Sequence, residues 1–216
     1  MLGDRGDIKE MKKFIAYAAV FGKKSNFKMP RPFDMNVERV LYTDLDVFEP
    51  HVFYQVKKIS LDHMSLNFTR KNRIAKILIP DEIFDNYEYS LYLDYKHPTE
   101  ADFDHLVNCL EPDSDILVSK HKMRDCIYDE GQKCIEKGKG SESEILEQLY
   151  FYRTQGYPAH NGLFANYWIF RRHTKRLREQ MHLWWRQVEE YSERDQISLP
   201  YVAWKHNMKI SNPVRH

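Results

Sequence analysis

The chain has few cysteines, and their arrangement excludes two kinds of small protein. Its 216 residues contain three, Cys109, Cys126 and Cys134, with no C-x-x-C pair. An odd number without paired spacing argues against a disulfide framework. Close ligand spacing of the kind that zinc sites use is also missing from the sequence. We therefore expect a reducing, cytoplasmic environment.

Strong net charge and long apolar runs are also missing. The formal net charge is +1, so no overall field draws the chain to nucleic acid or to an anionic membrane. No apolar run is long enough to span a bilayer. The first 13 residues are charged and lack the apolar core of a signal peptide. The sequence thus predicts no transmembrane segment.

Three common catalytic motifs are absent as well. The sequence contains no G-x-S-x-G elbow, no phosphate-binding P-loop and no G-x-G-x-x-G turn, which counts against serine hydrolases, nucleotide triphosphatases and dinucleotide-dependent dehydrogenases. Aromatic residues are abundant, with 14 Tyr, 12 Phe and 4 Trp. They suffice for a core and leave aromatic side chains for a binding cleft.

The length suits one domain over residues 13–216, preceded by a polar arm over residues 1–12. Apolar runs alternate with amphipathic stretches, which predicts an α/β fold with a mostly parallel sheet flanked by helices. We expect strands at 14–22, 39–44, 51–59, 90–94, 115–121 and 160–171. We expect helices at 67–79, from Thr99 with that residue as N-cap, within 129–156, at 173–192 and from 193, the last followed by a final strand.

Acidic residues stand where two predicted strands end. Asp44, in the run Asp44-Leu45-Asp46, follows one strand, and Asp94 ends another. Open α/β sheets bind ligands at the carboxyl ends of their strands. Carboxylates there can hold Mg²⁺ or Mn²⁺ beside a diphosphate, although acids are also common in ordinary turns.

A basic face is predicted on the helix that begins near residue 67. Arg70, Arg73 and Lys76 recur at i, i+3 and i+6, so they share roughly one side. Such a face can clamp phosphate oxygens or can simply be solvated. His121 and Arg124 follow another predicted strand, where they could contact substrate or lie on the surface.

Two late segments carry further candidates. Asn161 and Gly162 form a turn before a strand, and Gly162 could let the backbone pass close to another group. Ser192 could be the N-cap of the last helix, which would place Asp195 and Gln196 in its first turn. Trp184 and Trp185 fit the core better than a sugar-binding platform.

Taken in order, these segments resemble one family. The relevant runs are FIAYAAVFGKK, LYTD, the basic face, SLYLD, HKMRDCIYDE, EQLYFYRTQGYPAHNGL, the Trp-Trp helix and SERDQISLPY. The chain resembles a family long filed as a domain of unknown function, which includes mucilage-related galacturonosyltransferase-like proteins of plants and glycosyltransferase-like proteins of bacteria and phages. The resemblance covers about residues 13–210.

This resemblance implies a compact GT-A glycosyltransferase fold and a catalytic domain over 13–216. The Asn161-Gly162 and Asp195-Gln196 pairs also resemble, in order and type, two motifs at the reacting sugar of glycogenin-like retaining galactosyltransferases. By that likeness Asp195 would lie at the anomeric carbon, with Gln196 and Asn161 beside it. Asp94 would hold Mn²⁺ or Mg²⁺, and His206 is a candidate later ligand. Lys96 occupies the usual place of a second metal ligand, so that cation could replace part of the metal charge at the diphosphate.

The reaction so implied is transfer of a hexosyl or pentosyl group from a nucleotide-diphosphate sugar, expected to be UDP-linked, to a hydroxyl acceptor. The acceptor would be a glycan or a hydroxymethylated base of phage DNA. Two alternatives stay open: a hydrolase of the same family, and a non-catalytic nucleotide- or sugar-binding protein. The following residues are expected to contact the donor: Ala18, Val20, Phe21, Gly22, Thr43, Asp44, Arg70, Arg73, Lys76 and Gly162. His121, Arg124 and Lys96 are expected at the acceptor or the diphosphate.

Overall fold

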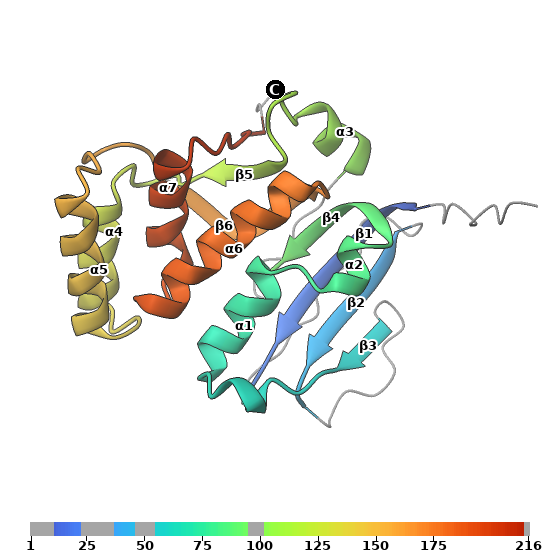
Figure 1. Cartoon of the computed structure of the whole chain (residues 1–216), viewed down its shortest axis with the longest axis horizontal. Helices are drawn as coiled ribbons and strands as arrows, with labels where there is room; N and C mark the ends of the chain where they lie inside the picture. The colour runs from blue at the N-terminus through green and yellow to red at the C-terminus, as the bar shows by residue number, and fades with distance from the viewer. Residues whose placement is uncertain (1–10, 23–36, 46–54, 95–101, 214–216) are drawn as a thin grey trace, which may run out of the picture.

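A mixed six-stranded sheet forms the centre of the protein. The computed structural model describes residues 11–22, 37–45, 55–94 and 102–213 (Figure 1). The strand order is β3-β2-β1-β4-β6-β5. The strands are β1 (Lys12–Val20), β2 (Glu38–Thr43), β3 (Gln55–Lys58), β4 (Tyr87–Leu93), β5 (Ile116–Lys120) and β6 (Phe164–Arg172). The pairs formed by β1, β2, β3 and β4 are parallel, and β6 runs antiparallel to both its neighbours. The expected mostly parallel α/β sheet is therefore confirmed.

Apolar runs explain why the central strands form. The last six residues of β1 are all buried, and so are the last four of β2, as expected for parallel strands covered on both faces. In the register Val20 pairs with Thr43, and Tyr17 pairs with Tyr92 one residue before the end of β4. The carboxyl ends of these strands thus meet at one edge of the sheet. The segments that follow them, 23–36, 46–54 and 95–101, lie outside the described residues.

Helices cover this sheet and extend it on one side. They are α1 (Phe68–Ile77), α2 (Asp81–Phe84), α3 (Phe103–Asn108), α4 (Ile127–Glu136), α5 (Glu142–Thr154), α6 (Lys175–Glu190) and α7 (Asp195–Lys205), with a short 3-10 turn at Asp62–Met64. Figure 1 shows α1 and α6 in front of the sheet, while α4 and α5 lie together beside α7 at the end away from β3. No helix in this described part of the chain is long and apolar enough to cross a membrane.

Local capping decides where α1 and α3 begin. The Asn67 side chain accepts a hydrogen bond from the Arg70 amide, so α1 begins with an ordinary N-cap. The N-cap of α3 is Asp102, which accepts from the His105 amide at 3.1 Å. Thr99, the cap expected from the sequence, falls outside the described residues, and α3 is shorter than predicted.

Two expectations near the carboxyl terminus are wrong. The N-cap of α7 is Arg194, which makes no side-chain capping bond. Ser192 instead donates its hydroxyl hydrogen bond to Gln148 in the buried interior. The predicted final strand is reduced to a single bridge between Leu117 and Ser211.

The buried side of the sheet fixes the end of α1. Arg171 of β6 is completely buried and donates to the carbonyls of Lys76 and Ile77 at 2.7 and 3.2 Å. These carbonyls have no partner inside the helix, because α1 ends there. Trp184 and Trp185 are buried in the same core, as the sequence favoured. The contact of Arg171 holds the last turn of α1 against the sheet, and this turn carries Lys76.

Candidate functional site

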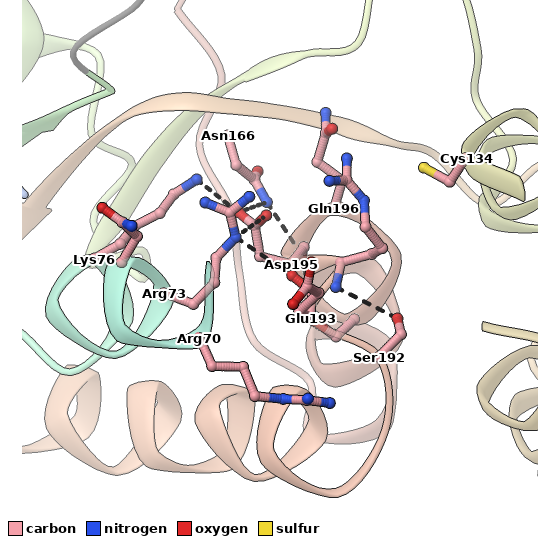
Figure 2. A network of polar contacts seen from close by, with 12 residues as sticks. Arg70, Arg73, Lys76, Cys134, Asn166, Ser192, Glu193, Asp195 and Gln196 are labelled. Atoms are coloured by element: carbon pink, nitrogen blue, oxygen red, sulfur yellow. Dashed lines mark hydrogen bonds and ion pairs between the residues drawn. The ribbon is translucent and has the colours of Figure 1, made fainter. Parts of the chain in front are cut away.

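Three charged residues from two distant segments meet beside the sheet. Lys76 Nζ lies 2.6 Å from Asp195 Oδ2, and Arg73 Nε lies 2.9 Å from Asp195 Oδ1. Lys76 and Asp195 are 119 positions apart in the sequence. Figure 2 shows both cations reaching from α1 toward the carboxylate at the start of α7. The basic helix and the Asp-Gln pair, identified separately in the sequence, therefore form one group.

This group is almost closed to water. Asp195 is 2% exposed, and the side chains of Lys76 and Arg73 are 3% and 15% exposed. Burial alone would raise the pKa of Asp195, but Arg73 and Lys76 outweigh it and hold that pKa well below its ordinary value. Burial lowers the pKa of Lys76 to about 8, although Asp195 opposes this change. Asp195 is thus an ionised carboxylate that holds two cations in fixed positions.

A buried amide completes the group. Asn166 of β6 donates from Nδ2 to the Asp195 backbone oxygen at 3.2 Å and to its Oδ2 at 3.3 Å. Asn166 is 2% exposed, and its Oδ1 has no hydrogen-bond partner within the described part of the protein. Buried polar atoms are nearly always hydrogen-bonded, so a free acceptor here is notable. Sequence analysis missed Asn166, although a polar residue inside an apolar strand is a signal that could have found it.

Gln196 fastens the first turn of α7 to the sheet. Its Nε2 donates to the carbonyl of Phe164, the first residue of β6, at 3.0 Å. Together with the Asn166 contacts, this bond fixes the position of the Asp195 carboxylate relative to the strand. The first turn of α7 is therefore held against β6, with Gln196 bonded to the backbone of that strand.

Asp94 lies close enough to affect the same cations. It follows β4, and its amide donates to the Tyr167 carbonyl at 2.7 Å. Its negative charge acts to raise the pKa of both Arg73 and Lys76. The predicted strand-end acid and the predicted basic face are therefore electrostatically coupled. With Asp195 included, two formal positive charges face two formal negative charges.

Arg70 does not join this group. Its guanidinium pairs with Glu144 at 3.1 Å and donates to the carbonyl of Val188 at 3.2 Å and to that of Tyr191. Figure 2 shows Arg70 pointing away from Asp195. Three residues per step is less than a full helical turn, so successive members of the basic face rotate around α1. The expectation that Arg70 faces the donor is not supported, because its side chain ties α1 to α5 and α6.

The side chains at the ends of β1 and β2 are buried or bonded within the fold. The expected donor residues Ala18, Val20 and Phe21 are at most 6% exposed, with their side chains in the core. The Gly22 amide donates to Asp44 Oδ1 at 3.0 Å, and Thr43 Oγ1 accepts from the Leu45 amide at 3.1 Å. Asp44 and Thr43 thus fix the ends of their own strands. The ring of Phe68 packs directly against Gly22, so this glycine is covered by α1.

The turn before β6 differs from expectation. Gly162 has φ of 93°, a backbone conformation suited to glycine, but a Cβ there would meet nothing within 4 Å. Glycine is therefore needed for the conformation of the turn and not for a close approach. Asn161 is exposed in this turn, and the amide that contacts Asp195 is Asn166 instead.

The remaining predicted residues are used locally or lie elsewhere. His121 Nδ1 accepts from the Arg124 amide at 3.0 Å, and the Arg124 side chain pairs with the buried Glu130 at 2.6 Å. His206 is exposed just beyond the end of α7. At a rise of about 1.5 Å per residue, it lies roughly 16 Å along the helix axis from Asp195. Lys96 lies outside the described residues. The structure therefore does not bring His121, Arg124 or His206 to Asp195.

A sizeable apolar cavity in the described regions is separate from this group. It has a volume of about 310 Å³ and is lined by α1, α2 and α6 residues that include Ile74, Phe84 and Met181. No member of the Asp195 group lines it. The Asp195 group and this cavity are therefore two separate features of the fold.

Comparison with solved structures supports the fold. The chain aligns with the apo structure of the WbbM bifunctional glycosyltransferase at a TM-score of 0.54 and 13% identity, covering 98% of this chain and 40% of that one. It therefore spans less than half the length of WbbM. Mouse xyloside xylosyltransferase 1, also in its apo form, aligns at a TM-score of 0.51 and 10% identity over 93% of this chain and 84% of that chain. At such identities the likeness shows the fold, and it confirms the GT-A-type architecture.

A family model identifies the relatives of the sequence itself. No curated protein matches the chain. The model described as TOD1/MUCI70, glycosyltransferase-like domain, matches residues 54–215, which include Lys76, Asn166 and Asp195. That span is most of the chain and agrees with the resemblance seen in the sequence. The chain therefore belongs to the TOD1/MUCI70 glycosyltransferase-like family.

Proposed function

We propose that this protein is a glycosyltransferase that moves a hexosyl or pentosyl group from a nucleotide-diphosphate sugar, UDP-linked, to a hydroxyl acceptor. The observation that carries this proposal is the buried group of Asp195, Arg73 and Lys76, with the unpartnered Asn166 Oδ1 beside it. It combines fixed cations, a fixed carboxylate and a free hydrogen-bond acceptor. The acceptor substrate we propose is a glycan or a hydroxymethylated DNA base.

The chemistry of such a transfer fits these side chains. The bond between the anomeric carbon and the diphosphate oxygen breaks, a bond from that carbon to the acceptor oxygen forms, and the acceptor proton passes to the leaving diphosphate. Arg73 and Lys76 would stabilise negative charge that grows on the diphosphate. Asp195 would stabilise positive charge on the oxocarbenium-like sugar, as carboxylates do in glycoside chemistry. We propose retention of configuration, with leaving group and acceptor on the same face of the sugar.

The burial of Asp195 indicates a different role for each residue of the group. Arg73 is the most exposed member of the ion pair, so it is the side chain best placed to meet a phosphate oxygen. Asn166 Oδ1 can accept a hydrogen bond from a sugar hydroxyl. Asp195 holds both cations and the Asn166 amide at fixed positions. Preorganised charges of this kind need no reorganisation during the reaction.

The charge balance favours a divalent cation at the diphosphate. Arg73 and Lys76 are balanced by Asp195 and Asp94, so a diphosphate would find no net positive charge. The Asp94 carboxylate suits Mn²⁺ or Mg²⁺, which neutralise phosphate oxygens when bound. The described part of the chain gathers three potential metal ligands only at Cys126, Asp129 and His160, a group without Asp94 or His206. We therefore propose Asp94 alone, among the described residues, as a ligand for this metal.

A screen of nucleotide sugars tests the proposal. Thermal unfolding is measured with UDP, GDP and ADP sugars, with and without Mn²⁺. Product formation is then assayed with each nucleotide sugar that stabilises the fold. A true donor present at one hundred times its dissociation constant should stabilise the fold by about 2.7 kcal/mol. Product formation from at least one of these donors would support the transferase. A chain that none of them stabilises would contradict it.

One observation favours a second candidate function. Asp195 is only 2% exposed, and a carboxylate sealed by two cations can be purely structural. A non-catalytic nucleotide- or sugar-binding protein would then be the better description. Donor binding without transfer to any acceptor, and without hydrolysis of the donor, would favour that alternative.

A further inference from the structure

Backbone hydrogen bonds connect the segment that follows β5 to the segment that precedes β6. Lys120, the last residue of β5, pairs with Phe164, the first residue of β6. Beyond this pair, the His121 amide donates to the Leu163 carbonyl at 2.8 Å, and the Gly162 amide donates to the Asp125 carbonyl at 2.8 Å. The segment that leaves β5 and the segment that enters β6 therefore lie side by side, although a pair of helices separates them in the sequence.

Three side chains of kinds that can bind metals meet at this junction. The ligand atoms of Cys126, Asp129 and His160 all lie within 4.8 Å of one another. Cys126 is the N-cap of α4 and is 2% exposed, and Asp129 lies in the first turn of that helix. His160 is supplied by the loop before β6.

A fourth residue orients the imidazole. His160 Nδ1 lies 2.8 Å from Asp125 Oδ1, so metal binding through Nε2 of the same ring would keep this contact. Metal-binding histidines usually bond their other ring nitrogen to a carboxylate or carbonyl in this way. Asp125 would then support the imidazole from behind, while Asp129 belongs to the same group as the thiol.

We propose that Cys126, Asp129 and His160 bind Zn²⁺, with Asp125 supporting His160 and water in the fourth coordination position. Thiolate, imidazole and carboxylate together match the ligands of zinc, whereas Mg²⁺ and Mn²⁺ prefer sites built from oxygen. Tetrahedral zinc bonded at about 2.0–2.3 Å requires ligand atoms about 3.5 Å apart, so separations of up to 4.8 Å must shorten by at most about 1.3 Å. Cys126 is held by the fold, while the exposed Asp129 and His160 side chains can make this movement.

Metal titration of the full-length, chelator-treated chain tests this site. Zn²⁺ affinity and stoichiometry are measured by competition with a chromophoric chelator, and Co²⁺ replaces zinc for absorption spectroscopy. We expect one Zn²⁺ per chain and a sulfur-to-cobalt charge-transfer band. His160→Ala should weaken zinc binding more than about a hundredfold, and Asp125→Asn by about 10–100-fold, as is usual for residues behind a ligand. Cys126→Ser should abolish the charge-transfer band.

Matched controls separate this site from other thiols and imidazoles. Cys109→Ser and His206→Ala change residues outside the group and should leave affinity and spectrum unchanged. His160 and Asp129 are exposed, so their variants stay informative if Cys126→Ser fails to fold. Less than one equivalent of Zn²⁺, a cobalt spectrum without the thiolate band, or full affinity in His160→Ala would overturn the proposal. None of these readouts depends on transferase activity.

Discussion

The Asp195 group and the Cys126 group differ in how completely the fold satisfies their polar side chains. At Asp195, two cations and an amide already satisfy a buried carboxylate. At Cys126, a buried thiol faces two exposed side chains whose ligand atoms are separated by up to 4.8 Å. A buried charge without partners in the fold is costly, whereas exposed ligand groups are solvated and need no ion for the protein to fold. The first group should therefore control stability, and the second should respond to added metal.

Removing the carboxylate should give the largest loss of stability. Asp195→Ala leaves Arg73 and Lys76 buried without the carboxylate that contacts both, and breaking a buried pair in this way costs about 3–5 kcal/mol. Denaturant unfolding of wild type and variant measures the difference. Asp129→Ala, a carboxylate of the exposed group, serves as the control and should change stability by less than about 0.5 kcal/mol. Equal effects of the two substitutions would remove the distinction between the groups.

Arg70 tests whether the basic face of α1 has two separate roles. Arg70→Ala removes the pair with Glu144 and the bonds to two carbonyls, so it should cost about 2 kcal/mol of stability. Affinity for a nucleotide sugar should change less than about twofold when it is measured below the unfolding temperature. A large loss of donor affinity with unchanged stability would place Arg70 at the donor after all.

The two asparagines near the start of β6 provide a finer test. Asn166→Ala removes the free acceptor beside Asp195, and one hydrogen bond of about 1.4 kcal/mol corresponds to a tenfold loss of kcat/KM. Asn161→Ala changes an exposed turn residue and should leave kcat/KM within about twofold. Steady-state kinetics of both variants decides the matter. The reverse order of effects would restore the residue chosen from the sequence.

The pKa of Lys76 predicts a smaller, pH-dependent effect. Burial lowers it to about 8 in the folded protein, against an ordinary value of 10.5. Between these two values the unfolded chain binds a proton that the folded chain has released, so rising pH favours the folded state. Wild type should therefore gain stability relative to Lys76→Met as the pH rises from 8 to 10.5. Unfolding measured across this range checks the sign, and parallel curves would refute the shift.

The sequence was sufficient where a local pattern determines the structure. Buried apolar runs predicted β1, β2 and β4, and a helical stretch from Asn67 up to Pro80 predicted the helix that carries Arg73 and Lys76. Both sides of the central ion pair could therefore be assigned to their elements from the sequence. Spacing along the chain says nothing about contact between residues 119 positions apart, so only the family resemblance suggested that they share a site.

The sequence was insufficient where contacts between distant segments determine the structure. Cys126 and His160 have no recognisable metal spacing, and they meet because β5 ends where its antiparallel neighbour β6 begins. Ser192 resembled a helix cap, but a buried hydrogen bond to Gln148 takes its hydroxyl. Asn166 was overlooked because nothing in its local sequence shows that this position of β6 contacts the first turn of α7.

Transfer by the Asp195→Asn variant tests the central claim most directly. This substitution keeps the size of the side chain, and the comparison is made at a temperature where both proteins are folded and saturated with the same nucleotide sugar. We predict that the variant binds the donor with nearly unchanged affinity and transfers it at least about a hundredfold more slowly, equivalent to roughly 2.7 kcal/mol of transition-state stabilisation. Transfer within a few-fold of the wild-type rate would contradict the account and leave Asp195 with a structural role alone.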